Sequence, residues 1–159
     1  SYLIQELEHW LYQQRGIHLP EARPLSDKEM VMLGGYFEKR ILDLTRVASV
    51  DQVSNPEFYD ELAKKGIPIP MDFTSAVGFT LVDCILLRKG FESIPILFHE
   101  MVHVVQTDLL GLRKLIRLYL TDLTNNGYLN VLFERQAYDL AARFTSGESF
   151  SVMKILKKQ

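Results

Sequence analysis

Residues 93–111 have the sequence SIPILFHEMVHVVQTDLLG. Ser93 suits the N-cap of a helix, Pro95 is tolerated in its first turn, and Gly111 suits its end. Most of the residues between these points are apolar, and a helix that is apolar on all sides is usually buried. The sequence therefore predicts a helix from Ser93 to about Leu110 that lies in the core of the fold.

The middle of this segment reads His99-Glu100-Met101-Val102-His103, the HExxH pattern. Residues four apart stack on one face of a helix, so both imidazoles can reach one ion from the same side. Glu100 is rotated by about 100° from His99 and can touch a metal-bound water without binding the ion. The alternative is two hydrogen-bonded histidines that merely share a face, but three ionisable groups in a buried helix are costly without a metal or partners. The pattern therefore predicts a Zn²⁺ site.

A catalytic zinc site usually has three protein ligands and a water molecule, so a third ligand is expected elsewhere in the chain. Glu134 is the preferred candidate. It lies on an otherwise apolar helical face within residues 131–138, which an antiparallel return of the chain could bring over the histidines. The remaining candidates are Asp108, which would have to bend back along its own helix, and Asp122, Asp139, His9 and His18.

The order His99, Glu100, His103 and, 31 positions after His103, Glu134 resembles the gluzincin clan of zinc metallopeptidases, whose third ligand is a glutamate on a later helix. Over residues 73–145 the chain is similar to small bacterial zincin-like proteins of largely uncharacterised function. The resemblance implies a compact zincin-like core in which His99, His103 and Glu134 bind Zn²⁺. It also implies a peptide or protein substrate that binds extended along a sheet edge, supplied here by residues 73–87.

One position departs from the pattern of the related enzymes. They place an aspartate four residues after the ligand glutamate, where it can orient a ligating histidine, whereas this chain has Tyr138 there and Asp139 next. Asp139 or Gln106, which lies on the histidine face one turn on, is a candidate for that role. Tyr138 and Tyr128 are candidates for stabilising a developing oxyanion, and a buried place in the core is the alternative for each.

The sequence therefore predicts a zinc-dependent metallopeptidase in which Glu100 is the acid and base that activates the hydrolytic water. The alternative is a catalytically silent zincin-like module, a binding or interaction protein whose ion only holds helices together. The missing aspartate favours the alternative, as does the small size of the chain, which leaves little protein for a deep cleft. Against it, structural zinc sites normally use four protein ligands with several cysteines, and Cys84 is the only cysteine.

Composition narrows the range of partners. In 159 residues, 18 Lys and Arg oppose 20 Asp and Glu, which gives a net charge of −2, so we expect no nucleic-acid partner. No apolar run approaches the roughly 18 residues of a membrane span. Residues 112–118 form a basic amphipathic stretch, but a solvated face over a buried stripe explains this pattern more often than membrane contact does. The single cysteine and the lack of a signal-peptide pattern in residues 1–8 favour the cytoplasm.

The chain length predicts one α+β domain over residues 1–159. Residues 1–72 are expected to supply N-terminal helices and a strand. The elements expected there are a helix from Leu3 that Gly16 ends, an extended connection over 17–25, a capping-box helix from Ser26 to Leu33, a strand over 42–53 and a short helix over 57–65.

Residues 73–145 are expected to form the metal-site core, in which the helix of residues 93–110 packs under a small sheet. The other elements expected there are a hairpin or two short strands over 73–87 and two helices over 112–123 and 130–144, with a loop at 125–127 between them. Beyond this core, residues 154–158 are expected to be a soluble tail.

Overall fold

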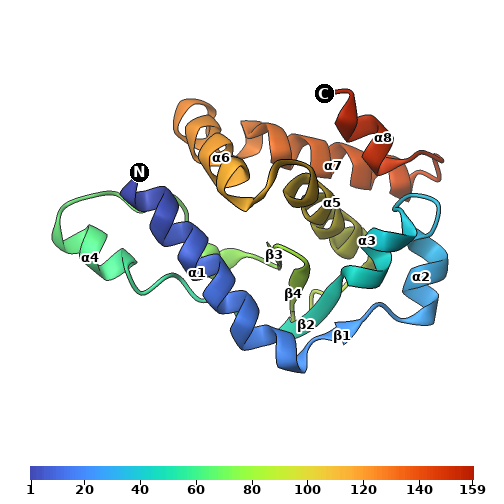
Figure 1. Cartoon of the computed structure of the whole chain (residues 1–159), viewed down its shortest axis with the longest axis horizontal. Coiled ribbons are helices and arrows are strands. Elements are labelled where there is room, and N and C mark those ends of the chain that lie inside the picture. The colour runs from blue at the N-terminus through green and yellow to red at the C-terminus, as the bar shows by residue number, and fades with distance from the viewer.

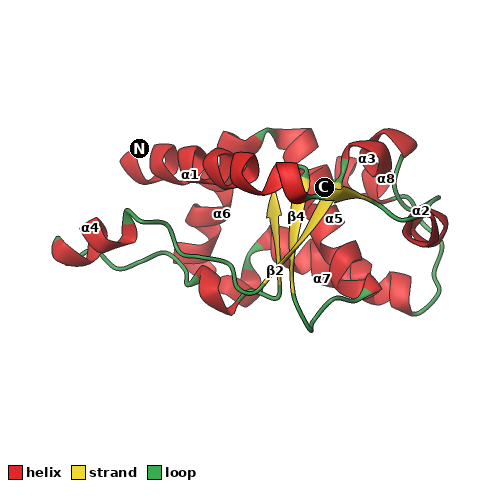
Figure 2. Ribbon diagram, turned by 90° about the horizontal axis from the view of Figure 1, so that it is seen from below, coloured by secondary structure: helices red, strands yellow, loops and turns green.

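A mixed four-stranded sheet lies between layers of helices in the computed structural model, which describes residues 1–159 (Figure 2). The strands are β1 (Arg23–Pro24), β2 (Arg46–Val50), β3 (Gly78–Leu81) and β4 (Cys84–Arg88). Their order in the sheet is β1-β2-β4-β3, with β2 and β4 parallel and the outer pairs antiparallel. The α+β class is therefore confirmed. The hairpin expected over residues 73–87 forms from β3 and β4, whereas residues 73–75 form a 3₁₀ turn instead. β3 is an edge strand.

Alternating side chains of the central strands divide the core into two clusters, as the period of two along a strand requires. On β4, Ile85 and Leu87 join a cluster with α5 (Ile94–Leu110), whereas Leu86 joins a second cluster with α1 (Tyr2–His18). The sheet is thus covered on one face by α5 and on the other by α1. This arrangement confirms the expected packing of a small sheet against the helix of residues 93–110.

The helix of residues 93–110 forms as predicted. The Ser93 hydroxyl accepts a hydrogen bond from the Ile96 amide at 3.3 Å, and the helix ends at Leu110 where Gly111 adopts a positive φ of 81°. Ten of the residues of α5 from Leu97 to Thr107 are buried. The central position of α5 therefore follows from its continuous apolar sequence.

The chain then returns along α5. Two further helices, α6 (Leu112–Asn126) and α7 (Leu132–Thr145), follow it. Because α6 continues to Asn126, the loop expected from residue 125 begins two residues later, at Gly127. Phe98 stacks on Phe144 at a centroid distance of 4.5 Å, and Gln106 bonds to the Phe133 carbonyl, so α5 and α7 run antiparallel. Figure 1 shows α7 lying alongside α5.

Two predictions in the N-terminal part are wrong. Gly16 does not end α1, which continues to His18, because the chain can stay helical until Pro20 enters the 3₁₀ turn Leu19–Glu21. The strand expected over 42–53 is shorter, because α3 (Lys39–Leu44) occupies its first residues and β2 starts at Arg46. By contrast, α2 (Asp27–Leu33) has the predicted capping box at Ser26, and α4 (Tyr59–Lys64) lies within its predicted range.

The expected tail at 154–158 is also wrong. These residues belong mostly to α8 (Val152–Lys157), which buries Val152, Met153 and Leu156 against the α5 face of the core. The two lysines of this helix, Lys154 and Lys157, lie three residues apart on its exposed face, which leaves their charges in water. None of the helices has the length and apolar character needed to cross a bilayer.

Candidate metal centre

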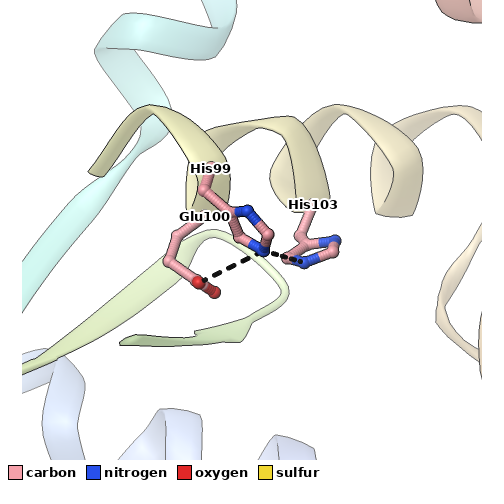
Figure 3. A group of neighbouring side chains, drawn as sticks. All are labelled: His99, Glu100 and His103. Atoms are coloured by element: carbon pink, nitrogen blue, oxygen red, sulfur yellow. Dashed lines mark hydrogen bonds and ion pairs between the residues drawn. The ribbon is translucent and has the colours of Figure 1, made fainter. Parts of the chain in front are cut away.

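Three side chains from two antiparallel helices meet at one point. The Nε2 atoms of His99 and His103 lie 3.2 Å apart, and Oε1 of Glu134 lies 3.0 Å from the first and 3.1 Å from the second. The two imidazoles project from the same side of α5, as a spacing of four residues requires (Figure 3). The structure therefore brings together the three residues that the sequence proposes as metal ligands.

This triangle fits the ligand set of a tetrahedral zinc ion. Zinc bonds of about 2.0–2.1 Å to nitrogen and oxygen place neighbouring ligand atoms about 3.3 Å apart. The observed distances of 3.0, 3.1 and 3.2 Å differ from that value by a few tenths of an ångström. Two imidazoles and one carboxylate are also the donors that zinc commonly takes in catalytic sites.

Glu100 lies beside the triangle rather than in it. Its Oε2 is 3.9 Å from His99 Nε2, and the donor atoms of His99, Glu100 and His103 all lie within 4.8 Å of one another. Strand β3 holds the carboxylate, because the Thr80 hydroxyl lies 2.9 Å from Glu100 Oε1 and can donate to it. At Gly78, an added Cβ would lie 2.9 Å from Glu100 Cγ, so the absence of a side chain there makes room for Glu100.

Gln106 fixes the orientation of His103. Its Nε2 donates to the Phe133 carbonyl and to Gln136 at 3.0 Å each, which turns its Oε1 toward His103 Nδ1 at 2.7 Å. Because an amide oxygen only accepts, His103 Nδ1 must donate. In the neutral imidazole, the lone pair then lies on Nε2, toward the shared point of the triangle.

The charged groups of the cluster shift one another's pKa values. Burial alone would lower the pKa of His103, but the Glu134 carboxylate raises it above its usual range. Burial alone would raise the pKa of Glu134, but His103 and hydrogen bonds from both histidines and Tyr119 hold it well below its usual range. Burial raises the pKa of Glu100, even though the neighbouring histidines act in the opposite direction. The site therefore combines an ionised carboxylate with one that holds a proton more readily.

Of the two candidates for orienting a histidine, Gln106 makes the contact and Asp139 does not. The carboxylate of Asp139 instead lies 3.5 Å from Arg143, one turn away on the same helix. The other ligand candidates are also engaged elsewhere: Asp108 pairs with Arg40, and Asp122 accepts the Leu132 amide at 2.6 Å. His9 and His18 lie on α1 and join no group of possible ligands.

Tyr138 and Tyr128 line the site at its solvent side. The Tyr138 ring meets His99 edge-on at a centroid distance of 4.4 Å and is 50% exposed, so a buried core position is excluded for it. Tyr128 is 39% exposed, and its hydroxyl lies 3.5 Å from that of Tyr138. Both side chains therefore line the cavity of the site and are partly exposed to solvent.

Tyr119 of α6 is a site residue that the sequence analysis missed. Its hydroxyl donates to Glu134 Oε2 at 2.6 Å. Burial, followed by the nearby Glu134 charge, raises the pKa of Tyr119, so the hydroxyl keeps its proton and acts as a donor. A signal was present, because Tyr119 lies three residues after buried Ile116 on the inner face of a helix, where a tyrosine hydroxyl needs a partner.

A cavity of about 910 Å³ surrounds the cluster. Its lining includes all four residues of the cluster, His99, Glu100, His103 and Glu134. Residues 75–80, which contain the first three residues of edge strand β3, also line it. Hydrophobic residues make up 18 of its 30 lining positions, so a molecule bound there would lose much of its water. The small size of the chain therefore does not prevent a large cavity at the cluster.

The chain matches no known family profile, no curated protein and no solved structure. Any assignment of function therefore depends on the geometry and chemistry of these residues.

Proposed function

We propose that this protein is a zinc-dependent metallopeptidase with a zincin-like core of the gluzincin type. The observation that carries the proposal is the triangle of His99, His103 and Glu134 donor atoms, whose sides of 3.0–3.2 Å suit one tetrahedral ion. Glu100 lies at its edge without occupying a ligand position. Three protein ligands with an adjacent carboxylate favour a catalytic site over a structural one.

In this proposal His99, His103 and Glu134 hold Zn²⁺, which supplies polarisation of the scissile carbonyl and acidification of water. Glu100 accepts a proton from the attacking water and delivers it to the amine that leaves. Tyr138 and Tyr128 are the candidates to donate to the oxyanion, because they line the same cavity as the triangle and their hydroxyls lie 3.5 Å apart.

The place of β3 supports an extended peptide as substrate. β3 is an edge strand, and Gly78 and Thr80 on it lie beside Glu100 in the wall of the cavity. The free main-chain groups of an edge strand can pair with a peptide whatever its side chains. A peptide added there would run past the histidines.

One observation supports the peptidase over a catalytically silent module. The cavity gives a substrate access to His99, Glu100, His103 and Glu134. An ion that only holds helices together needs no such cavity, whereas the Gln106 contact would orient His103 in either kind of zinc site.

The test compares wild-type protein with Glu100→Gln, which keeps the size of the side chain but removes the base. Both proteins should bind one zinc ion per chain, and only the wild type should cleave denatured casein or a peptide library. Glu57→Gln, at an exposed position, is the matched control and should leave both properties unchanged. Zinc binding without cleavage by the wild type would favour the silent module, and full activity of Glu100→Gln would remove Glu100 from its role.

A further inference from the structure

The Glu134 carboxylate is divided between two sets of partners. Oε1 faces the two imidazoles at 3.0 and 3.1 Å, whereas Oε2 accepts the Tyr119 hydroxyl at 2.6 Å. Glu134 is only 6% exposed, so water can do little to replace either partner. The short hydrogen bond to an ionised acceptor belongs to the stronger class of hydrogen bonds.

Tyr119 comes from a helix that supplies none of the three triangle residues. Its helix, α6, is anchored to α1 through the Arg113–Glu8 ion pair at 2.7 Å and to the core through Ile116. α6 also binds the start of α7, because the Asp122 carboxylate accepts the Leu132 amide at 2.6 Å. The Tyr119 hydroxyl therefore reaches Glu134 from an element whose position is fixed on both sides.

We propose that Tyr119 is a positioning residue that holds Glu134 so that one carboxylate oxygen, and only one, faces His99 and His103. The inference rests on the proposed function, since it assigns Tyr119 a role toward the zinc ion. A carboxylate that turned to offer both oxygens would have to release the Tyr119 hydroxyl. Tyr119 would thereby present one oxygen of Glu134 to a zinc ion held by the two histidines.

The effect is expected in metal affinity. Loss of a partner that orients a ligand typically weakens metal binding about 10- to 100-fold. Tyr119→Phe keeps the ring and removes only the hydroxyl, so its zinc dissociation constant, measured by competition with a chelator, should rise by about that factor. Visible spectra of the Co²⁺-substituted protein should change as well, because they respond to the number and geometry of the ligands.

Tyr59→Phe is the matched control. Tyr59 is a buried tyrosine whose hydroxyl donates to the Met71 carbonyl at 2.8 Å, and it does not line the cavity. It should lose thermal stability to a similar extent as Tyr119→Phe in the metal-free state. Its zinc affinity should equal that of the wild type.

A second comparison shows whether Tyr119 acts through Glu134. In a Glu134→Ala background, Tyr119→Phe should change the zinc dissociation constant by less than about twofold, because the Tyr119 hydroxyl then has no carboxylate to hold. The effects of the two substitutions would therefore not add. Equal zinc affinity of wild type and Tyr119→Phe would overturn the inference and leave the peptidase proposal standing, as would the same loss of affinity with and without Glu134. Failure of the wild type to bind zinc would overturn both, whereas zinc binding without cleavage would overturn only the peptidase.

Discussion

Gln106 and His103 form the contact that fixes the direction of one proposed metal ligand. His103 Nδ1 donates to Gln106 Oε1 at 2.7 Å, and the amide of the same glutamine donates to the Phe133 carbonyl of α7 at 3.0 Å. The glutamine therefore links the helix of the histidines to the helix of Glu134. Orientation of a histidine and alignment of the two helices depend on one buried side chain, which is 2% exposed.

Gln106→Leu should weaken zinc binding about 10- to 100-fold, because His103 loses the acceptor that selects its tautomer. The metal-free protein should also lose about 1–2 kcal/mol of unfolding free energy with the hydrogen bonds of a buried amide. Chelator competition measures the first effect and urea unfolding the second.

Gln52→Leu is the control for this change, since Gln52 donates to the Thr74 carbonyl at 3.1 Å and bonds to neither Gln106 nor a histidine. It should retain wild-type zinc affinity. Zinc binding by Gln106→Leu at wild-type strength would show that the His103 contact has no role in the metal site.

Gly78→Ala should separate hydrolysis from metal binding. The new Cβ would lie 2.9–3.1 Å from Cγ, Oε2 and Cδ of Glu100, so the carboxylate has to move, whereas the three triangle residues are not among the atoms it meets. A misplaced catalytic group commonly costs about 100-fold in rate, so kcat should fall by roughly that factor with zinc affinity unchanged.

Gly16→Ala is the matched glycine control. Gly16 lies within α1 and a Cβ there would meet nothing within 4 Å, so alanine should raise stability by roughly 0.5–1 kcal/mol without changing peptide cleavage. If Gly78→Ala cleaves peptides at the wild-type rate, the position of Glu100 observed here is not the one that catalysis uses.

Local sequence signals were sufficient for much of the fold and for the centre of the site. α5 begins after Ser93 and ends before Gly111, as the capping preferences of these residues predict. The spacing of His99 and His103 places both on one face of the helix. The apolar face around Glu134 correctly indicated a helix packed inward. In each case the deciding contacts lie within one helix or follow from its buried stripe.

Other features depend on contacts between segments far apart in the chain. Residues 42–44 alternate apolar and polar side chains as a strand does, yet they end α3, in which Ile41 and Leu42 pack against the α5 side of the core. The inner face of α6 predicts that Tyr119 needs a partner, but only the tertiary fold shows that the partner is Glu134. The sequence pattern of a single segment does not contain such a pairing.

Leu156→Ala should test the part of the core that α8 supplies. Leu156 is 7% exposed and packs in the same cluster as α5, so the substitution should cost about 2–4 kcal/mol of unfolding free energy. Lys158→Ala, at an exposed position after the helix, should change it by less than about 0.5 kcal/mol. Equal urea midpoints for the two variants would be the behaviour of a soluble tail and would contradict the packing of α8.

Cys84 should be inert in the folded protein, because its side chain is inaccessible and burial raises the pKa of its thiol to about 11. Alkylation requires the thiolate, so iodoacetamide at pH 8 should modify the protein in urea and leave the native protein unmodified.

The folded protein also keeps the Cys84 thiol protonated at pH values where the unfolded chain has lost that proton, from about pH 8.5 upward. This contribution to stability is therefore present below about pH 8.5 and lost as the pH rises toward 11. Cys84→Ala should show a smaller decline in unfolding free energy over that range than the wild type, whereas rapid labelling of the native protein would contradict the burial of the thiol.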